Sequence, residues 1–272
     1  GLGAMLLSIA GRPDENQAFE VIEAFIDCGG DFIDTANVYC LDNSDLGHNE
    51  CLIHRALERI GMSDQAIVAT KGGLTRPEGR WEVDGRPEWL RTSCEKSLKD
   101  LHAEVIELYQ LHAVDPRVGL ARSLEELLRL KEKDKIRHIG LSNVTKEQIQ
   151  YALSQTEIAS VQNRCNPFHK ADFHSGLVDF CARQGISYIP YSPVGGRSCH
   201  VRLTNHPLFQ ALAQKYGASP FCIALAWLLQ KGEHILPIPG ASRVASVRDN
   251  MGAAAITLES EDIAEIDALP DQ

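Results

Sequence analysis

The sequence lacks any uninterrupted apolar stretch near the roughly 18 residues that a transmembrane helix requires, so no membrane span is expected. It is also short of positive charge, with 27 Lys and Arg against 37 Asp and Glu and a net charge of −10. An acidic surface argues against a nucleic-acid or anionic-membrane partner, although a local basic pocket for one phosphate is still allowed. No signal peptide is visible. The opening GLGAM reads like the middle of a domain, so we expect a segment before the first strand to be missing.

Paired cysteine motifs are absent as well. The eight cysteines include no C-x-x-C pair and no disulfide-framework spacing, which indicates reduced thiols and a cytoplasmic protein. One cluster, His48, Cys51 and His54, resembles a metal-binding set. On a helix its first and last members diverge by about 120°, so a plain helix surface is favoured over a metal site.

The apolar residues, 44% of the chain, alternate between strand-like runs and amphipathic segments along its whole length. Strands are expected near residues 3–6, 31–34, 66–70, 105–111, 136–141, 158–162, 187–191 and 235–239. Helices are expected over 15–28, 48–60, 88–102, 119–133, 145–155, 172–184, 206–231 (broken near Gly217 and Pro220), 243–252 and 259–268. Eight such units predict an α/β protein with a single (β/α)8 TIM barrel over residues 1–272.

A doubly wound open sheet is the alternative fold. Such a sheet normally carries G-x-G-x-x-G after its first strand to bind a dinucleotide. Here only Gly1 and Gly3 match, and this pair is more typical of a tight turn. The barrel is therefore favoured.

A barrel places its active site at the carboxyl ends of the strands, and polar side chains occur at nearly every predicted strand end. They are Asp34, Lys71, His112, Ser142, Asn143, Gln162, Asn163, Tyr191 and Ser192, with Tyr39 in the loop after the second strand. Any one of these is common where a chain leaves the core. Together they indicate a functional site.

Four of these side chains fit one chemical purpose. A tyrosine hydroxyl has a pKa near 10 and is a weak acid at neutral pH, but the ammonium of Lys71 beside Tyr39 favours the phenolate. A carboxylate, Asp34, would hold the charge of a buried lysine. His112 adds a second hydrogen bond to the oxygen that Tyr39 protonates. This arrangement suits carbonyl reduction or its reverse, and such a reaction needs a nicotinamide as hydride carrier.

The sequence resembles the aldo-keto reductase superfamily along its whole length, and more closely the bacterial-type branch with a short C-terminal tail. The motifs that carry the resemblance are DFIDTANVY (31–39), GHNE (47–50), ATKGG (69–73), SLKDL…IELYQLH (97–112), IRHIGLSN (136–143), VQNRCN (161–166), PYSP (190–193) and IPGASR…N (238–250).

The resemblance implies a (β/α)8 barrel that binds NADPH without a Rossmann domain. It implies Tyr39 as the general acid, Lys71 and Asp34 as its tuning pair, and His112 as the group that orients the carbonyl. It also implies a set of cofactor contacts: Ser142, Asn143 and Gln162 on the nicotinamide carboxamide, Tyr191 on its ring, Ser192 near the pyrophosphate, and Gly240, Ala241, Ser242, Arg243 and Asn250 at the adenosine end.

Two residues, one in this set and one outside it, bear on specificity. Arg243 is the candidate for the 2′-phosphate, because arginine makes forked charge-assisted bonds to phosphate. The family's lysine-rich motif is replaced here by G-A-S-R, so NADH is the alternative cofactor. Trp81, in the loop after the third strand, is the candidate for the substrate wall.

The expected function is NAD(P)H-dependent reduction of an aldehyde or ketone to an alcohol, with a small-molecule carbonyl compound as partner. The oligomeric state and the physiological substrate are left open. Two alternatives stand beside this function. One is a cofactor-binding regulatory module with little turnover, and the other is an unrelated barrel, either a metal-dependent hydrolase or an aldolase that uses Lys71 as a Schiff base.

Overall fold

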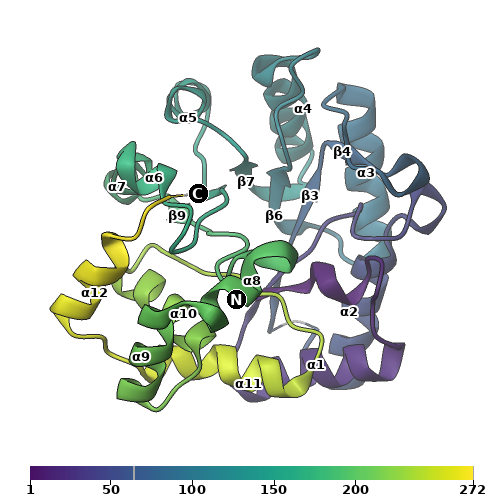
Figure 1. The fold of residues 1–272 in the computed structure, drawn as a ribbon. Coiled ribbons are helices and arrows are strands. Elements are labelled where there is room, and N and C mark those ends of the chain that lie inside the picture. Colours follow the sequence, from purple (N-terminus) through teal and green to yellow (C-terminus); the bar gives the residue numbers. More distant parts are fainter. Residues whose placement is uncertain (64, 272) are drawn as a thin grey trace.

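A curled parallel sheet forms the centre of the computed structural model, which describes residues 1–63 and 65–271, the side chains of 197–199 excepted. Each strand pairs in parallel with its neighbours (Figure 1). The order is β1 (Leu2–Gly3), β2 (Phe32–Asp34), β3 (Ile67–Gly72), β6 (Ile106–Leu111), β7 (Ile136–Ser142), β8 (Ser160–Gln162) and β9 (Ser187–Tyr188).

Residues 235–240 fill the eighth position and close the sheet into a barrel. On one side the Leu236 amide donates to the Tyr188 carbonyl at 2.9 Å, and on the other the Gly3 amide donates to the Pro239 carbonyl at 3.1 Å. A Cβ on Gly3 would lie 2.7 Å from the carbonyl oxygen of Ile238, so this close approach requires glycine. The predicted barrel is confirmed. The predicted tight turn is wrong, because Gly3 belongs to β1.

Helices cover the outside of the sheet and alternate with its strands (Figure 1). They are α1 (Glu15–Asp27), α2 (His48–Arg59), α3 (Pro87–Asp100), α4 (Leu120–Glu132), α5 (Lys146–Leu153), α6 (Ala171–His174), α7 (Leu177–Arg183), α8 (Gly196–Asn205), α9 (Pro207–Tyr216), α10 (Pro220–Gln230), α11 (Val244–Gly252) and α12 (Ser260–Asp267). Side-chain caps fix several starts. Asp14 accepts from the Gln17 amide, and Thr145 forms a full capping box with Gln148.

The structure differs from the sequence prediction in several places. The first strand spans Leu2–Gly3, and a 3-10 helix, η1 (Ala4–Leu7), replaces the rest of the expected strand. The helix predicted over 172–184 is broken at Gly176, whose φ of 70° favours glycine. A hairpin of β4 (Leu74–Thr75) and β5 (Glu82–Val83) and the helix α8 were not predicted.

The largest apolar cluster lies between the strands and α3 to α10, and α1 and α2 cover a second one. Trp227 on α10 is fully buried and belongs to the first cluster, as expected for a core residue. No helix within residues 1–63 and 65–271 has the length and apolar character needed to cross a membrane.

Candidate active site

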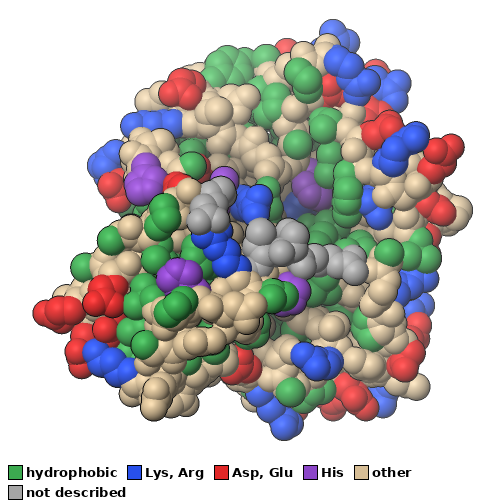
Figure 2. All heavy atoms as spheres, viewed as in Figure 1, with side chains coloured by type: hydrophobic (Ala, Val, Ile, Leu, Met, Phe, Trp, Pro, Cys, Tyr) green, Lys and Arg blue, Asp and Glu red, His purple; other side chains and the backbone are tan. Residues whose placement is uncertain are grey.

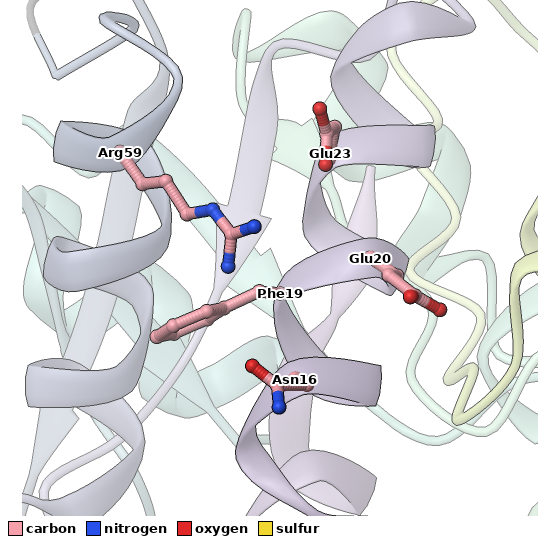
Figure 3. Close-up of a pocket in the computed structure, with 5 residues that line it drawn as sticks. All are labelled: Asn16, Phe19, Glu20, Glu23 and Arg59. Carbon is pink, nitrogen blue, oxygen red and sulfur yellow. The ribbon is translucent and has the colours of Figure 1, made fainter.

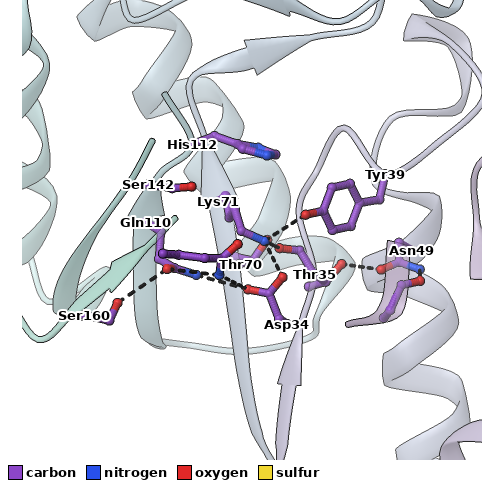
Figure 4. Close-up of polar contacts among 12 residues, drawn as sticks. Asp34, Thr35, Tyr39, Asn49, Thr70, Lys71, Gln110, His112, Ser142 and Ser160 are labelled. Carbon is purple, nitrogen blue, oxygen red and sulfur yellow. Dashed lines mark hydrogen bonds and ion pairs between the residues drawn. The ribbon is translucent and has the colours of Figure 1, made fainter. Parts of the chain in front are cut away.

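Three neighbouring strands bring the proposed tetrad together at one end of the barrel (Figure 4). Asp34 ends β2, Lys71 lies on β3, and His112 directly follows β6; the register pairs Asp34 with Ala69 and Lys71 with Gln110. The Lys71 ammonium donates to Asp34 Oδ2 at 2.5 Å, to the Thr35 carbonyl at 2.8 Å and to the Tyr39 hydroxyl at 3.0 Å. Lys71 therefore joins the carboxylate to the tyrosine.

The Asp34–Lys71 pair is enclosed on all sides. Lys71 is 0% and Asp34 1% exposed, and the second carboxylate oxygen, Oδ1, accepts from Gln162 at 2.7 Å and from Gln110 at 3.2 Å. A buried ion pair needs such additional hydrogen bonds to offset the loss of hydration. The site is thus held in place by side chains from β2, β3, β6 and β8.

Burial and charge act against each other on Tyr39 and Lys71. Burial raises the pKa of the Tyr39 hydroxyl, and the neighbouring Lys71 ammonium offsets only part of that increase. Burial alone would lower the pKa of Lys71, but Asp34 and Tyr39 outweigh it, so this pKa lies above its ordinary value. Lys71 acts on Tyr39 in the expected direction, while the net pKa of Tyr39 is raised, because the hydroxyl lies deep in the barrel.

His112 is held as a neutral imidazole. Burial, with repulsion from the Lys71 ammonium, lowers the pKa of His112 well below its usual value. The ring meets the Tyr39 ring edge to face, with centroids 5.8 Å apart. Its Nδ1 is enclosed without a hydrogen-bond partner among the described residues. A neutral imidazole beside the tyrosine hydroxyl can donate one hydrogen bond to a polar group bound there.

The residues expected at the nicotinamide lie next to this centre. Asn143 donates from Nδ2 to the His112 carbonyl at 2.9 Å and to Ser142 Oγ at 3.1 Å, and its Oδ1 accepts from the Tyr191 hydroxyl at 2.8 Å. Asn143 and Ser192 both have left-handed φ angles, 56° and 50°, a strained conformation that occurs often at binding sites. Gln162 uses its amide nitrogen on Asp34, and its contact with a carboxamide stays a prediction.

The residues expected at the adenosine end gather around the start of α11. Gly240 bridges to Gly3, Ala241 packs in the core beneath α1, and the Ser242 carbonyl accepts from Gln17 at 2.6 Å. Arg243 is exposed directly before the first turn of α11, and Asn250 lies on the same helix. An exposed guanidinium beside a helix N-terminus fits a phosphate group, so this donor set suits a phosphorylated dinucleotide.

Two other features of the surface lie away from this centre. His54 stacks on His102 rather than meeting His48 and Cys51, and no three His, Cys, Asp or Glu side chains in the described part of the chain could hold a metal ion. Figure 3 shows side chains that line a pocket between α1 and α2, where Arg59 lies over the Phe19 ring.

Sequence reasoning missed two residues of the site. Gln110 donates to Asp34, and the Thr35 carbonyl accepts from Lys71. Gln110 lies two residues before His112, and alternation along a strand puts both on one face, so a glutamine in that apolar strand was a usable signal. The carbonyl of Thr35 has no such signal, since every residue carries one.

The barrel and the Asp34, Tyr39, Lys71 and His112 cluster at the carboxyl ends of its strands define an oxidoreductase barrel of the aldo-keto reductase type. The chain belongs to the Aldo/keto reductase family, whose family model matches residues 1–271.

Individual relatives agree with this assignment. The chain is 33% identical to probable aldo-keto reductase 1 of Glycine max, over 99% of this chain and 85% of that protein. The thermostable aldo-keto reductase Tm1743, solved in complex with epalrestat, is 28% identical with a TM-score of 0.83, covering 98% of this chain and 93% of that one. An aldo-keto reductase from Klebsiella pneumoniae, in complex with NADP and acetate, is 25% identical with a TM-score of 0.80, covering 98% and 89%.

Proposed function

We propose that the protein is an NADPH-dependent carbonyl reductase in which Tyr39 protonates the carbonyl oxygen as the carbonyl carbon is reduced. The observation that carries the proposal is the 3.0 Å contact between the Lys71 ammonium and the Tyr39 hydroxyl, backed by the buried Asp34. The NADP complex of the Klebsiella pneumoniae relative supports the choice of cofactor. We further propose that residues 1–272 act as one catalytic domain.

The proton transfer follows from the charges around Tyr39. Its raised pKa keeps the hydroxyl protonated at neutral pH, so it is present in the donor form. As the proton moves to the substrate oxygen, negative charge develops on the phenol, and the Lys71 ammonium stabilises that charge. Asp34 keeps Lys71 fixed and protonated. Neutral His112 donates a ring N–H to the same substrate oxygen and orients the carbonyl.

The cofactor residues divide between the two ends of the site. NADPH supplies the hydride when it is bound. Ser142, Asn143 and Gln162 would hold the carboxamide, Tyr191 would stack on the nicotinamide ring, and Ser192 would face the pyrophosphate. Gly240, Ala241, Ser242, Arg243 and Asn250 would hold the adenosine end, with Arg243 on the 2′-phosphate; NADH is the alternative cofactor.

The surroundings of Lys71 do not favour an aldolase that uses this residue as a Schiff base. A lysine that forms a Schiff base must lose its proton, and such lysines have a lowered pKa. The pKa of Lys71 is raised, and its ammonium is engaged by three oxygens. The charged pair with Asp34 therefore fits a lysine that tunes a neighbour rather than one that attacks a carbonyl.

A panel of aldehydes and ketones with NADPH or NADH, followed by the loss of cofactor absorbance, tests the proposal. With NADPH deuterated at the nicotinamide C4, the label should appear on the carbon of the product alcohol. NADPH that stays bound and unconsumed across the whole panel would instead establish the regulatory module. The Tyr39→Phe variant serves as control, since it should bind NADPH and reduce little.

A further inference from the structure

Arg76 is a buried cation at the wall of the candidate active site. It follows β4, and its backbone amide donates to Asn43 Oδ1 at 2.7 Å, which ties the β4–β5 hairpin to the loop after Tyr39. The side chain is 5% exposed, and its Nη2 donates to the Cys40 carbonyl at 3.2 Å and to the Leu41 carbonyl at 3.4 Å. The guanidinium is therefore fixed beside the backbone of the residue that follows Tyr39.

The other two nitrogens of this guanidinium make no hydrogen bond to a described oxygen or nitrogen atom, although the guanidinium offsets part of the burial that raises the pKa of the Cys40 thiol. Nε and Nη1 are buried, and neither has a hydrogen-bond partner among the described residues. A role that merely clamps the two loops together requires only Nη2. Buried polar groups are normally hydrogen-bonded, and a buried donor without a partner is costly, so these two N–H groups call for a ligand.

Arg76 forms no direct ion pair with a carboxylate among residues 1–63 and 65–271, although hydrogen bonds from Ser44 and the charge of Arg76 together lower the pKa of Asp42. The two acidic residues in the adjoining loop make their direct contacts elsewhere: Asp45 pairs with Arg12 at 2.6 Å, and Asp42 accepts from Ser44 at 2.8 and 2.6 Å. A buried charge is normally paired. The two free donors and the absence of a direct ion pair both indicate an anion.

Trp81 lies between this cation and the catalytic tyrosine. The guanidinium carbon of Arg76 is 3.7 Å from the centroid of the indole, and the Tyr39 ring meets the same indole at 6.2 Å in an edge-to-face arrangement. Trp81 is 46% exposed, so its ring can turn outward more easily than a core residue. Figure 2 shows the face of the molecule hollowed toward its middle, with acidic side chains mainly around the outer edge.

We propose that Arg76 binds an oxyanion group of the substrate, a carboxylate or a phosphate, once the Trp81 indole rotates away from the guanidinium. The substrate class is then an aldehyde or ketone that carries an anionic group, with its carbonyl at Tyr39 and its anion at Arg76. This inference deepens the proposed carbonyl reductase function and rests on it. Arg76 serves specificity and takes no part in the chemical step.

The test compares matched aldehydes that differ in charge. The pairs are 4-carboxybenzaldehyde against its methyl ester, succinic semialdehyde against butanal, and glyceraldehyde 3-phosphate against glyceraldehyde. The wild type should prefer the charged member of at least one pair in kcat/KM. The first two pairs report a carboxylate site, and the third reports a phosphate site.

Arg76→Met should remove this preference. A hydrogen bond to a charged group corresponds to roughly a 10- to 100-fold change, so the ratio of kcat/KM for charged over neutral aldehyde should fall by that factor, chiefly through KM. Arg76→Lys, which keeps the charge, should retain part of the ratio. The matched control is Arg80→Met in the same hairpin, because Arg80 is exposed and pairs with Glu78 and Glu82. It should leave the ratio unchanged.

Failure of the inference is distinguishable from failure of the proposed function. A wild type that reduces neutral aldehydes but shows no preference for an anion overturns the inference alone, as does an Arg76→Met variant with an unchanged ratio. If no aldehyde is reduced, a binding measurement tests the anion site. Benzoate but not benzamide should change the tryptophan fluorescence, and Trp81→Phe should abolish the change. If Arg76→Met does not fold, Arg76→Lys and the wild-type titration with benzoate carry the test, and no response to benzoate refutes the anion site.

Discussion

The two ends of the candidate site are built in different ways. Around Asp34 and Lys71 the side chains are buried, and strand register places each of them. Around Arg243 the side chain is exposed at the start of a helix. Removing a side chain at the first end must disturb both folding and chemistry, whereas removing one at the second should disturb binding alone. Single substitutions at the two ends test that difference.

Lys71→Met should damage both rate and stability. Tyr39 loses the ammonium that stabilises its phenolate, and a turnover loss of roughly 10²- to 10⁴-fold is typical for lost acid catalysis. Asp34 is left buried without its partner, which costs about 3–5 kcal/mol of unfolding free energy. Urea unfolding and steady-state kinetics measure the two effects.

Lys96→Met is the matched control for this variant. Lys96 pairs with Asp100 at 2.6 Å, as closely as Lys71 pairs with Asp34, but it is 42% exposed. Because the ammonium is open to water, a pair of this kind is worth about 1 kcal/mol or less. If Lys71→Met is as stable as Lys96→Met and reduces aldehydes normally, the coupling of Asp34, Lys71 and Tyr39 is refuted.

Tyr39→Phe should remove the acid and leave the fold in place. Turnover should fall by roughly 10²- to 10⁴-fold, and NADPH affinity, measured by fluorescence titration, should hardly change. Stability should change less than in Lys71→Met, because no buried charge is left without its partner. Tyr151→Phe on α5, where the ring is 43% exposed, is the control. Near-normal turnover in Tyr39→Phe would remove this residue from the mechanism.

Glu50 extends the buried end of the site and should make the stability of the protein depend on pH. This fully buried carboxyl accepts from Thr70, the neighbour of Lys71, at 2.5 Å, and burial raises its pKa from 4.5 to about 7. The folded state therefore binds a proton that the unfolded state has lost between these pH values. The stability should fall by roughly 3 kcal/mol as the pH rises from 4.5 to 7 and level off above that.

Glu50→Gln should abolish this fall, as measured by urea unfolding at pH 5 and pH 8. Glu126 is a control of opposite sign: it is 2% exposed, but Arg91 pairs with it and its pKa is lowered. The contribution of Glu126 to the free energy of unfolding is present above the ordinary pKa of a glutamate and is lost as the pH falls. If the stability of Glu50→Gln depends on pH as strongly as that of the wild type, another group is responsible.

The sequence predicted the ordered core of the molecule better than its loops. Strand and helix periodicities identified the barrel and its predicted units, because burial of one face leaves a regular apolar pattern. Three members of the proposed tetrad, Asp34, Lys71 and His112, could be singled out because polar residues at strand ends depart from that pattern, and Tyr39 follows in the loop after the second strand. The β4–β5 hairpin and α8 were missed, since their lengths and packing depend on contacts with distant loops.

Electrostatics could be predicted only in part. The pairing of Asp34 with Lys71 follows from neighbouring strands, but the net pKa of Tyr39 depends on how deeply the ring is buried, which no local pattern reports. The same holds for Arg76. Nothing in the stretch TRPEGRW (75–81) shows that Arg76 is buried and Arg80 exposed, because the fold of the hairpin decides it.

Arg243→Ala tests the exposed end of the site and should have the smallest effect. If Arg243 holds the 2′-phosphate, NADPH affinity should fall by roughly 10- to 100-fold, the worth of one charged hydrogen bond, while NADH affinity and stability stay nearly unchanged. If the guanidinium stacks on the adenine instead, the binding of NADPH and of NADH should weaken together, since both carry that ring.

Dissociation constants for both cofactors separate these cases, with exposed Arg122 on α4 as the alanine control. Equal losses refute the phosphate role, and no loss for either cofactor removes Arg243 from the site. A stability loss as large as that of Lys71→Met would refute the division between a buried and an exposed end.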